Sequence, residues 1–195
     1  MRCAVVKRTT AETDIDIALT LEGSGKGMID TGVPFLDHML TLFASHGCFD
    51  LDVKCKGDTE VDCHHSVEDV GIALGEAFAK ALGDKAGIAR YGSTILPMDE
   101  ALIMTAIDLS GRCFLSYKLR IPTERVGDFD TECVSEFFWG FVRSCPSSLH
   151  IRKLDGTNSH HIIEGAFKSF ARTMKAAVAI DETLRGRLPS TKGML

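Results

Sequence analysis

His-His-Ser-Val-Glu at residues 64–68 recurs as His-His-Ile-Ile-Glu at residues 160–164, 96 positions further along the chain. Imidazole and carboxylate donors within one short phrase suit Mn, Fe, Ni or Zn. In a helix, residues four apart share a face, so the first histidine and the glutamate of each phrase can approach one ion. The second histidine is rotated by about 100° and points toward a different ion. The repeat therefore predicts two related halves and two metal ions that draw ligands from both halves or from neighbouring subunits.

Hydrophobic periodicity around the two phrases predicts a similar order of elements in each half. In the first half we expect strands at 3–8, 14–21 and 51–56 and helices at 35–45 and 64–82. In the second half we expect strands near 93–97, 101–109, 112–121 and 148–154 and helices at 131–142 and 160–180. The predicted class is α+β, with two duplicated halves at residues 1–88 and 89–195. Each half is expected to be a small mixed or antiparallel sheet with two helices packed on one face.

Composition excludes several classes of function. A net charge of −5 argues against nucleic acid as the main partner. No apolar run approaches the ~20 residues of a membrane helix, and the apolar stretch near Met1 is too short for a signal peptide. The seven cysteines form no CxxC pair, which is typical of reduced intracellular thiols. We therefore expect a cytoplasmic protein without a membrane partner.

Two further features extend the predicted metal site. His38 lies within a predicted helix and is a plausible additional ligand. Asp37 or Asp69 is expected to orient a ligating imidazole through its other ring nitrogen. Cys63 directly precedes the first phrase, and a small half-buried thiol is the expected role for it rather than a soft metal ligand.

Longer motifs around these residues carry a resemblance to a known family. They are Phe-Leu-Asp-His-Met-Leu at residues 35–40, Asp-x-His-His-x-x-Glu-Asp-x-Gly at 62–71, Ser-His-His-x-x-Glu followed by Phe-Lys at 159–168, and Ser-Thr-Lys-Gly at 190–193. Together they resemble the imidazoleglycerol-phosphate dehydratase family of histidine biosynthesis, over nearly the whole chain. By position, the resemblance implies seven metal ligands: His38, His64, His65, Glu68, His160, His161 and Glu164. The family commonly has a histidine as the eighth ligand, and this chain has Glu136 there, which makes the site more anionic and harder.

The resemblance also implies a reaction and an assembly. The reaction removes water from imidazoleglycerol phosphate to give imidazole acetol phosphate, with two Mn²⁺ ions at an active site between subunits of a 24-subunit shell. Glu12 is the implied general acid or base. The implied substrate-binding residues, most of them for the phosphate, are His46, Arg90, Arg112, Lys168, Ser190, Thr191 and Lys192. Lys168 lies four residues after the second phrase's glutamate, which places the two side chains on one helix face.

Two other functions remain open from the residues. A di-metal phosphatase would use the same ligands to activate water and would release phosphate without forming a ketone. A non-catalytic metal-binding or shell-forming protein would leave the arginines and lysines at the phosphate positions without a purpose. The chain lacks the Asp-rich ligand sets usual in two-metal phosphoryl chemistry, so the dehydratase is the favoured hypothesis.

Overall fold

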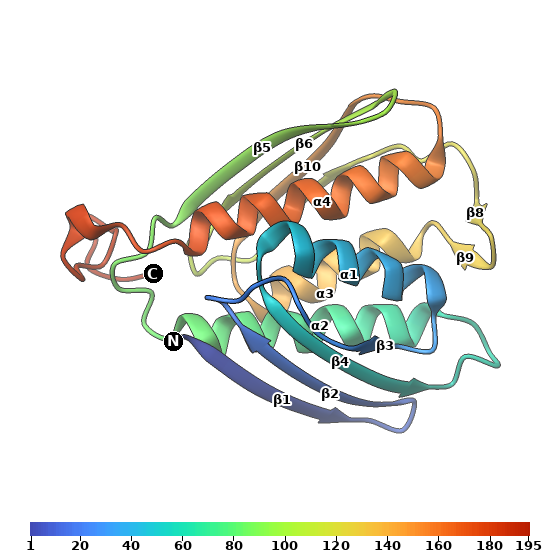
Figure 1. Ribbon diagram of the computed structural model, residues 1–195, viewed down its shortest axis with the longest axis horizontal. Helices are drawn as coiled ribbons and strands as arrows, with labels where there is room; N and C mark the ends of the chain where they lie inside the picture. Colours follow the sequence, from blue (N-terminus) through green and yellow to red (C-terminus); the bar gives the residue numbers. More distant parts are fainter.

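The computed structural model describes residues 1–195 and places four helices between two four-stranded sheets (Figure 1). The first sheet and its helices comprise β1 (Cys3–Thr9), β2 (Thr13–Thr20), β3 (Ile29–Asp30), α1 (Pro34–Gly47), β4 (Asp50–Gly57) and α2 (His64–Leu82). The second set comprises β5 (Tyr91–Met98), β6 (Ala101–Asp108), β7 (Phe114–Lys118), α3 (Cys133–Ser144), β10 (Ser148–Asp155) and α4 (Ser159–Val178). A ribbon of β8 (Arg125–Val126) and β9 (Phe129–Asp130) precedes α3, and a 3₁₀ turn, Glu182–Leu184, follows α4.

The two sheets share one topology. Their strand orders are β1-β2-β4-β3 and β5-β6-β10-β7. In both sheets the first three strands pair antiparallel and the last strand pairs parallel to its neighbour. The parallel pair is possible because a helix, α1 or α3, connects its two strands. Alternation of buried and exposed residues, seen along β2 and β6, gives each sheet one face for the helices.

The helices pack on the sheets and on helices of the other half. The helix α2 lies on β1, β2 and β4 and against α3, while α4 lies on β5 and β6 and against α1. Gly71 of α2 permits a close approach, since a Cβ there would lie 2.4 Å from the carbonyl oxygen of Phe137. Gly140 of α3 is equally confined, with a Cβ position 2.7 Å from the carbonyl oxygen of Glu68. Because of these two glycines, the starts of α2 and α3 lie side by side.

The predicted α+β class with paired helices is confirmed, and all four predicted helices are present within a few residues of their expected bounds. The sequence did not predict β3 or the β8–β9 ribbon, because two-residue strands carry no readable alternation. No helix is long and apolar enough to cross a membrane.

Candidate functional site

Three metal-ligand side chains meet where α1 packs on α4. The ligand atoms of His38, His160 and Glu164, here called the α1–α4 trio, all lie within 4.8 Å of one another. A Glu164 carboxylate oxygen lies 3.1 Å from Nε2 of His160 and 3.6 Å from Nε2 of His38. Two imidazoles and one carboxylate at this separation fit a transition-metal ion by their donor chemistry.

Local sequence fixes the start of α4 that carries this trio. The Asn158 side chain caps the helix by accepting a hydrogen bond from the backbone N–H of His161. The ring of Phe35 packs edge-on against His160, with centroids 5.3 Å apart. These contacts hold the histidine pair at the first turn of a 20-residue helix.

Glu164 stays ionised in a buried position. Its side chain is only 9% exposed, and Lys168, one turn later, donates a short hydrogen bond to it. Burial opposes ionisation, but the hydrogen bond and charge of Lys168, with a smaller contribution from His160, hold the pKa of Glu164 below its ordinary value. Burial and the positive charges of Lys168 and Arg172 lower the pKa of His46.

Three further predicted ligands, His64, Glu68 and Glu136, are here called the α2–α3 trio; unlike those of the α1–α4 trio, their ligand atoms do not all lie within 4.8 Å of one another. Nε2 of His64 lies 3.9 Å from a Glu68 carboxylate oxygen. Glu136 precedes Ser148, the first residue of β10, by 12 positions. It therefore occupies the place in its half that His38 occupies 12 positions before β4.

The packing of α3 supports this equivalence. Gly140, one turn after Glu136 and on the same face, lies against the backbone of Glu68. Arg143, on that face again, places Nη1 3.5 Å from a Glu68 carboxylate oxygen. The face of α3 that carries Glu136 thus packs against the turn of α2 that carries Glu68.

The second histidine of each phrase points elsewhere. The rings of the adjacent histidines are nearly perpendicular, at 86° for residues 64 and 65 and 87° for residues 160 and 161. Nδ1 of His65 lies 3.0 Å from Asp58, and Nδ1 of His161 lies 2.7 Å from Glu100. These hydrogen bonds raise the pKa of both histidines, and the bond from His161 lowers the pKa of Glu100 to about 2. Neither Nε2 makes a hydrogen bond, although Nε2 of His161 lies 3.6 Å from a carboxylate oxygen of Asp99.

The predicted orienting carboxylates were wrong. Asp37 accepts hydrogen bonds from the backbone and hydroxyl of Thr31, and Asp69 accepts them from Arg8 and Thr13. Both aspartates therefore fix strands and loops rather than imidazoles. The residues in the orienting position, Asp58 and Glu100, sit in connections after β4 and after β5, and only their turn positions distinguish them in the sequence.

Glu12 lies at the end of β1's connection to β2 and is half exposed. Its carboxylate oxygen is 3.7 Å from Nε2 of His65, the ring nitrogen that Asp58 does not contact. The structure therefore brings the predicted acid or base beside a predicted metal ligand that is 53 residues away in the sequence.

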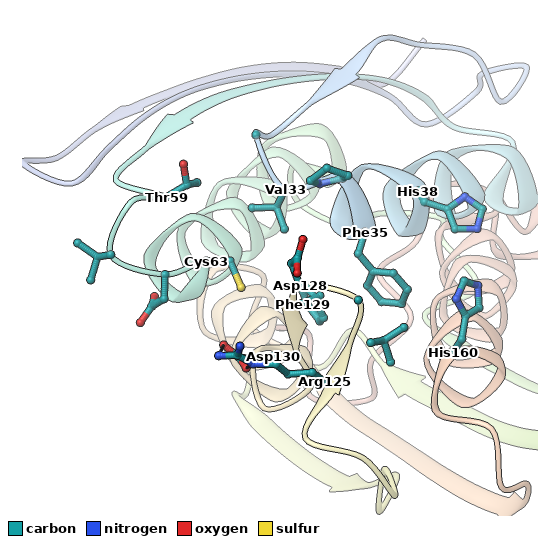
Figure 2. Close-up of a pocket in the computed structure, with 16 residues that line it drawn as sticks. Val33, Phe35, His38, Thr59, Cys63, Arg125, Asp128, Phe129, Asp130 and His160 are labelled. Carbon is teal, nitrogen blue, oxygen red and sulfur yellow. Dashed lines mark hydrogen bonds and ion pairs between the residues drawn. The ribbon is translucent and has the colours of Figure 1, made fainter.

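A cavity of about 830 Å³ opens beside the α1–α4 trio (Figure 2). His38 and His160 line one end, and the β8–β9 ribbon, Val33 and Thr59 line the rest. Cys63 also lines this cavity, with its thiol directed into it. A hydrogen bond from the Cys133 thiol and another from the backbone of Asp130 lower the pKa of Cys63 to about 6 against the effect of burial.

The predicted phosphate residues form a cluster at the far end of α4. Arg90 donates two hydrogen bonds to Asp108, at 2.7 and 3.1 Å, and one to the carbonyl of Pro189, at 2.7 Å. Arg112 lies 3.9 Å from the same aspartate. The tail residues Ser190, Thr191 and Lys192 follow directly, and the backbone of Arg90 bonds to Ala177. Ala177 and His160 are 17 residues apart on α4, which is about 25 Å along the helix axis.

Lys168 is the exception among these cations. It lies within α4, half-way between the trio and the tail, and its ammonium is engaged by Glu164. The structure therefore brings three of the predicted metal ligands together in the α1–α4 trio. It also pairs His64 with Glu68 on the turn of α2 that faces Glu136's helix. It separates both from most of the predicted phosphate residues.

The fold and the site together define an α+β protein with a histidine–carboxylate group able to hold a metal ion. The sequence model of the family described as imidazoleglycerol-phosphate dehydratase matches residues 31–174. Relatives of that name include one from Microcystis aeruginosa, 56% identical over 194 residues, which are 100% of this chain and 93% of the relative. Another, from Methylorubrum extorquens, is 55% identical over 195 residues and covers 100% of both chains.

Solved structures agree with the sequence comparison. The imidazoleglycerol-phosphate dehydratase of Staphylococcus aureus superposes with a TM-score of 0.83 at 37% identity, over 92% of this chain and 99% of that one. The Pyrococcus furiosus enzyme, solved in complex with (S)-C348, gives a TM-score of 0.83 at 36% identity, over 97% and 100%. The chain belongs to the imidazoleglycerol-phosphate dehydratase family. The predicted family and the predicted hydro-lyase class are thereby confirmed.

Proposed function

We propose that this chain dehydrates imidazoleglycerol phosphate to imidazole acetol phosphate at an active site that holds two Mn²⁺ ions. The observation that carries the proposal is the α1–α4 trio, whose three ligand atoms gather within 4.8 Å beside a cavity of about 830 Å³. Family membership supplies the reaction, and the trio supplies a chemically suitable place for the metal.

The two ions would be held by the two trios. Each trio combines two side chains from one half of the chain with one from the other, and Glu136 holds in its trio the position that His38 holds in the other. His65 and His161 point away from these groups. A carboxylate is hydrogen-bonded to Nδ1 of each ring, which leaves Nε2 available to a metal. We infer that these two histidines complete the coordination of trios on neighbouring subunits.

The placement of the cations supports an assembled active site. Within one chain, Arg90, Arg112 and the tail 190–192 lie about 25 Å along α4 from His160. One small substrate cannot span the two groups of a single chain. We therefore propose that the metal trio of one subunit and the phosphate cluster of another bind the same substrate molecule. Twenty-four chains of 21.2 kDa would form a particle of about 509 kDa, and a 21.2 kDa species in light scattering would contradict the assembly.

The chemistry then divides among the residues. The trios would hold the metal ions, which would supply the Lewis acidity that eases loss of the hydroxyl group from the substrate. Glu12, beside His65, is placed to accept a proton from the substrate carbon chain or to return it to the departing oxygen. Arg90 and Arg112 supply paired N–H donors for the phosphate, and Lys192 supplies a point charge. His46, near the charge of Lys168, would contact the substrate.

The test is ketone formation from imidazoleglycerol phosphate by chelator-stripped protein, with and without added Mn²⁺. We expect no product without metal and restored product with it. Glu12→Gln should retain bound metal and lose most activity, whereas Glu22→Gln, a carboxylate paired with Arg2 at the other end of β2, is the matched control and should stay active. Release of inorganic phosphate without ketone would support a phosphatase and refute the proposal.

A further inference from the structure

The cysteines carry chemistry that the proposed dehydration does not use. All seven are free thiols. The Sγ atoms of Cys63 and Cys133 lie 3.8 Å apart, and they are the one pair of thiols in contact. Cys63 is the residue immediately before α2, and Cys133 is the first residue of α3. Their contact therefore joins the first turns of two helices from different halves.

The two thiols differ in access. Cys63 is partly exposed and its sulfur points into the cavity beside Val33 and Asp130, as Figure 2 shows. Cys133 is 2% exposed and lies behind it. A small reagent that enters the cavity therefore meets Cys63 first, with a second thiol already in contact with the sulfur it modifies.

We propose that Cys63 and Cys133 form an oxidation site, at which a hydroperoxide converts the two thiols into an intramolecular disulfide. The Cys63 sulfur attacks a peroxide oxygen, the O–O bond breaks, and Cys63 becomes a sulfenic acid while water or an alcohol leaves. The Cys133 sulfur then attacks the Cys63 sulfur, and the sulfenic hydroxyl leaves as water with the Cys133 proton. One S–S bond forms, the thiols lose two electrons, and the peroxide gains them.

The disulfide forms only if the sulfur atoms of Cys63 and Cys133 move closer together, and this movement would affect neighbouring residues. The sulfurs must approach by nearly 2 Å from 3.8 Å to reach the ~2.05 Å of a disulfide. Residues 60–62, which precede Cys63, are exposed, so few packed side chains oppose a movement of Cys63. The new bond would pull on His64, the next residue, and on Glu136, three residues after Cys133. On the basis of the metal sites proposed above, we infer that oxidation weakens metal binding at the α2–α3 trio and leaves metal binding at the α1–α4 trio unchanged.

The oxidation site is tested on the assembled, metal-loaded protein. It is treated with hydrogen peroxide, the remaining thiols are blocked with N-ethylmaleimide, and non-reduced peptides are mapped by mass spectrometry. The expected main product links Cys63 to Cys133. In Cys133→Ser the link is absent and Cys63 remains a sulfenic acid that dimedone labels. Cys145→Ser, which removes a buried thiol with no sulfur partner, is the matched control and should give the same link as the unaltered chain.

Two results would overturn the proposal. One is a Cys63 that stays reduced while the exposed Cys113 is oxidised. The other is a Cys63 that pairs only with another chain. The inferred effect on metal is measured separately, as Mn²⁺ per chain before oxidation, after it and after reduction with dithiothreitol. We expect loss of about half the bound metal and its recovery, as metal release follows loss of ligand geometry. Unchanged metal in the disulfide form would refute the coupling, and a reduced protein that binds no Mn²⁺ would refute the proposed function instead.

Discussion

The α1–α4 trio and the α2–α3 trio are built on the same helix geometry but have different surroundings. Glu164 is 9% exposed and engaged by Lys168, itself 15% exposed, whereas Glu68 is 28% exposed and engaged by Arg143, 56% exposed. The third position holds a histidine in one trio and Glu136 in the other. The carboxylate of the first group is therefore more buried than Glu68, although the histidines of both groups are similarly exposed. The first group has one carboxylate and the second has two. The repeated backbone sets where ligands lie, and neighbouring side chains set how each site behaves.

Removing one ligand from each trio should have the largest effect. We expect His160→Ala and His64→Ala each to lower the number of tightly bound Mn²⁺ ions from two per chain to one. Activity should fall by about 10³-fold in both variants. Loss of a metal ligand should reduce activity more than the ~10–100-fold reduction that follows loss of a residue hydrogen-bonded to a ligand. Metal analysis and ketone formation check this. If one variant keeps both ions and full activity, that trio does not bind metal.

Removing an orienting carboxylate should have a smaller effect. Glu100→Gln keeps the size of the side chain but removes the charge that fixes His161. We expect metal affinity to fall by about 10–100-fold. Glu182→Gln, in the 3₁₀ turn far from the trios, is the control and should bind metal normally. Equal affinities in a titration would show that the Glu100 contact has no role in ligation.

Acid should act through the same contacts. The carboxylates raise the pKa of His65 and His161, so a proton competes with a metal at each ring. Metal affinity should be full above these raised pKa values and fall as the pH drops through them, by up to ~10-fold per pH unit for each proton displaced. In metal-free protein the pH acts in the opposite direction on the contact between Glu100 and His161. This contact is strongest when His161 is protonated, and it weakens as the pH rises through the raised pKa of His161. Metal affinity that is constant between pH 5 and 8, a range that spans the ordinary histidine pKa of ~6.5, would contradict this.

Removal of the two cations should reveal the difference in burial between Glu164 and Glu68 in metal-free protein. Lys168→Met leaves the buried Glu164 carboxylate without its main partner, and we expect a loss of about 1–3 kcal/mol in the free energy of unfolding. Arg143→Met breaks an exposed pair and should cost less than about 0.5 kcal/mol. Urea unfolding of the chelated protein measures both. Equal losses would mean that the two glutamates are equally buried in solution.

The smallest expected effect comes from making the trios alike. Glu136→His gives the α2–α3 trio the donor set of its counterpart and removes one negative charge. We expect a few-fold shift in preference from Mn²⁺ toward Ni²⁺ or Zn²⁺ at one of the two sites, because imidazole suits these ions better than a carboxylate does. Competition titration against Glu132→Gln, the exposed acid that precedes α3, measures the shift. No difference between the two variants would exclude Glu136 from the metal site.

The sequence predicted most of the fold, and its candidate ligands include His38, His160 and Glu164, which the structure brings together. The roles of His64, Glu68 and Glu136 stay predictions. The His-His-x-x-Glu phrases and the helical periodicity around them are local patterns, and a local pattern is readable without a structure. The sequence did not predict the helix packing that joins His38 to α4 or brings α3 to Glu68, because those contacts join residues more than 70 positions apart. The division at residues 1–88 and 89–195 stays a prediction that the matching sheet topologies support.

Two features of the site could not be predicted from sequence patterns. Asp58 and Glu100 were missed because each sits in a turn, where acidic residues are common for reasons unrelated to metals. The sequence also did not predict the distance between Arg90 and His160. Both residues match positions of the same family, but α4 holds them far apart. This separation is the observation from which we propose that a second chain contributes to the active site.

Mixing two inactive variants tests that proposal most directly. His160→Ala removes a trio ligand, and the double variant Arg112→Ala, Lys192→Ala removes phosphate contacts on exposed positions. Each is unfolded and refolded alone and together, and ketone formation is measured in the resulting oligomers. If the trio and the phosphate cluster of one active site come from different chains, the mixture should regain about one quarter of full activity by random assembly. Mixed oligomers that stay inactive, like each variant alone, would contradict an active site shared between chains.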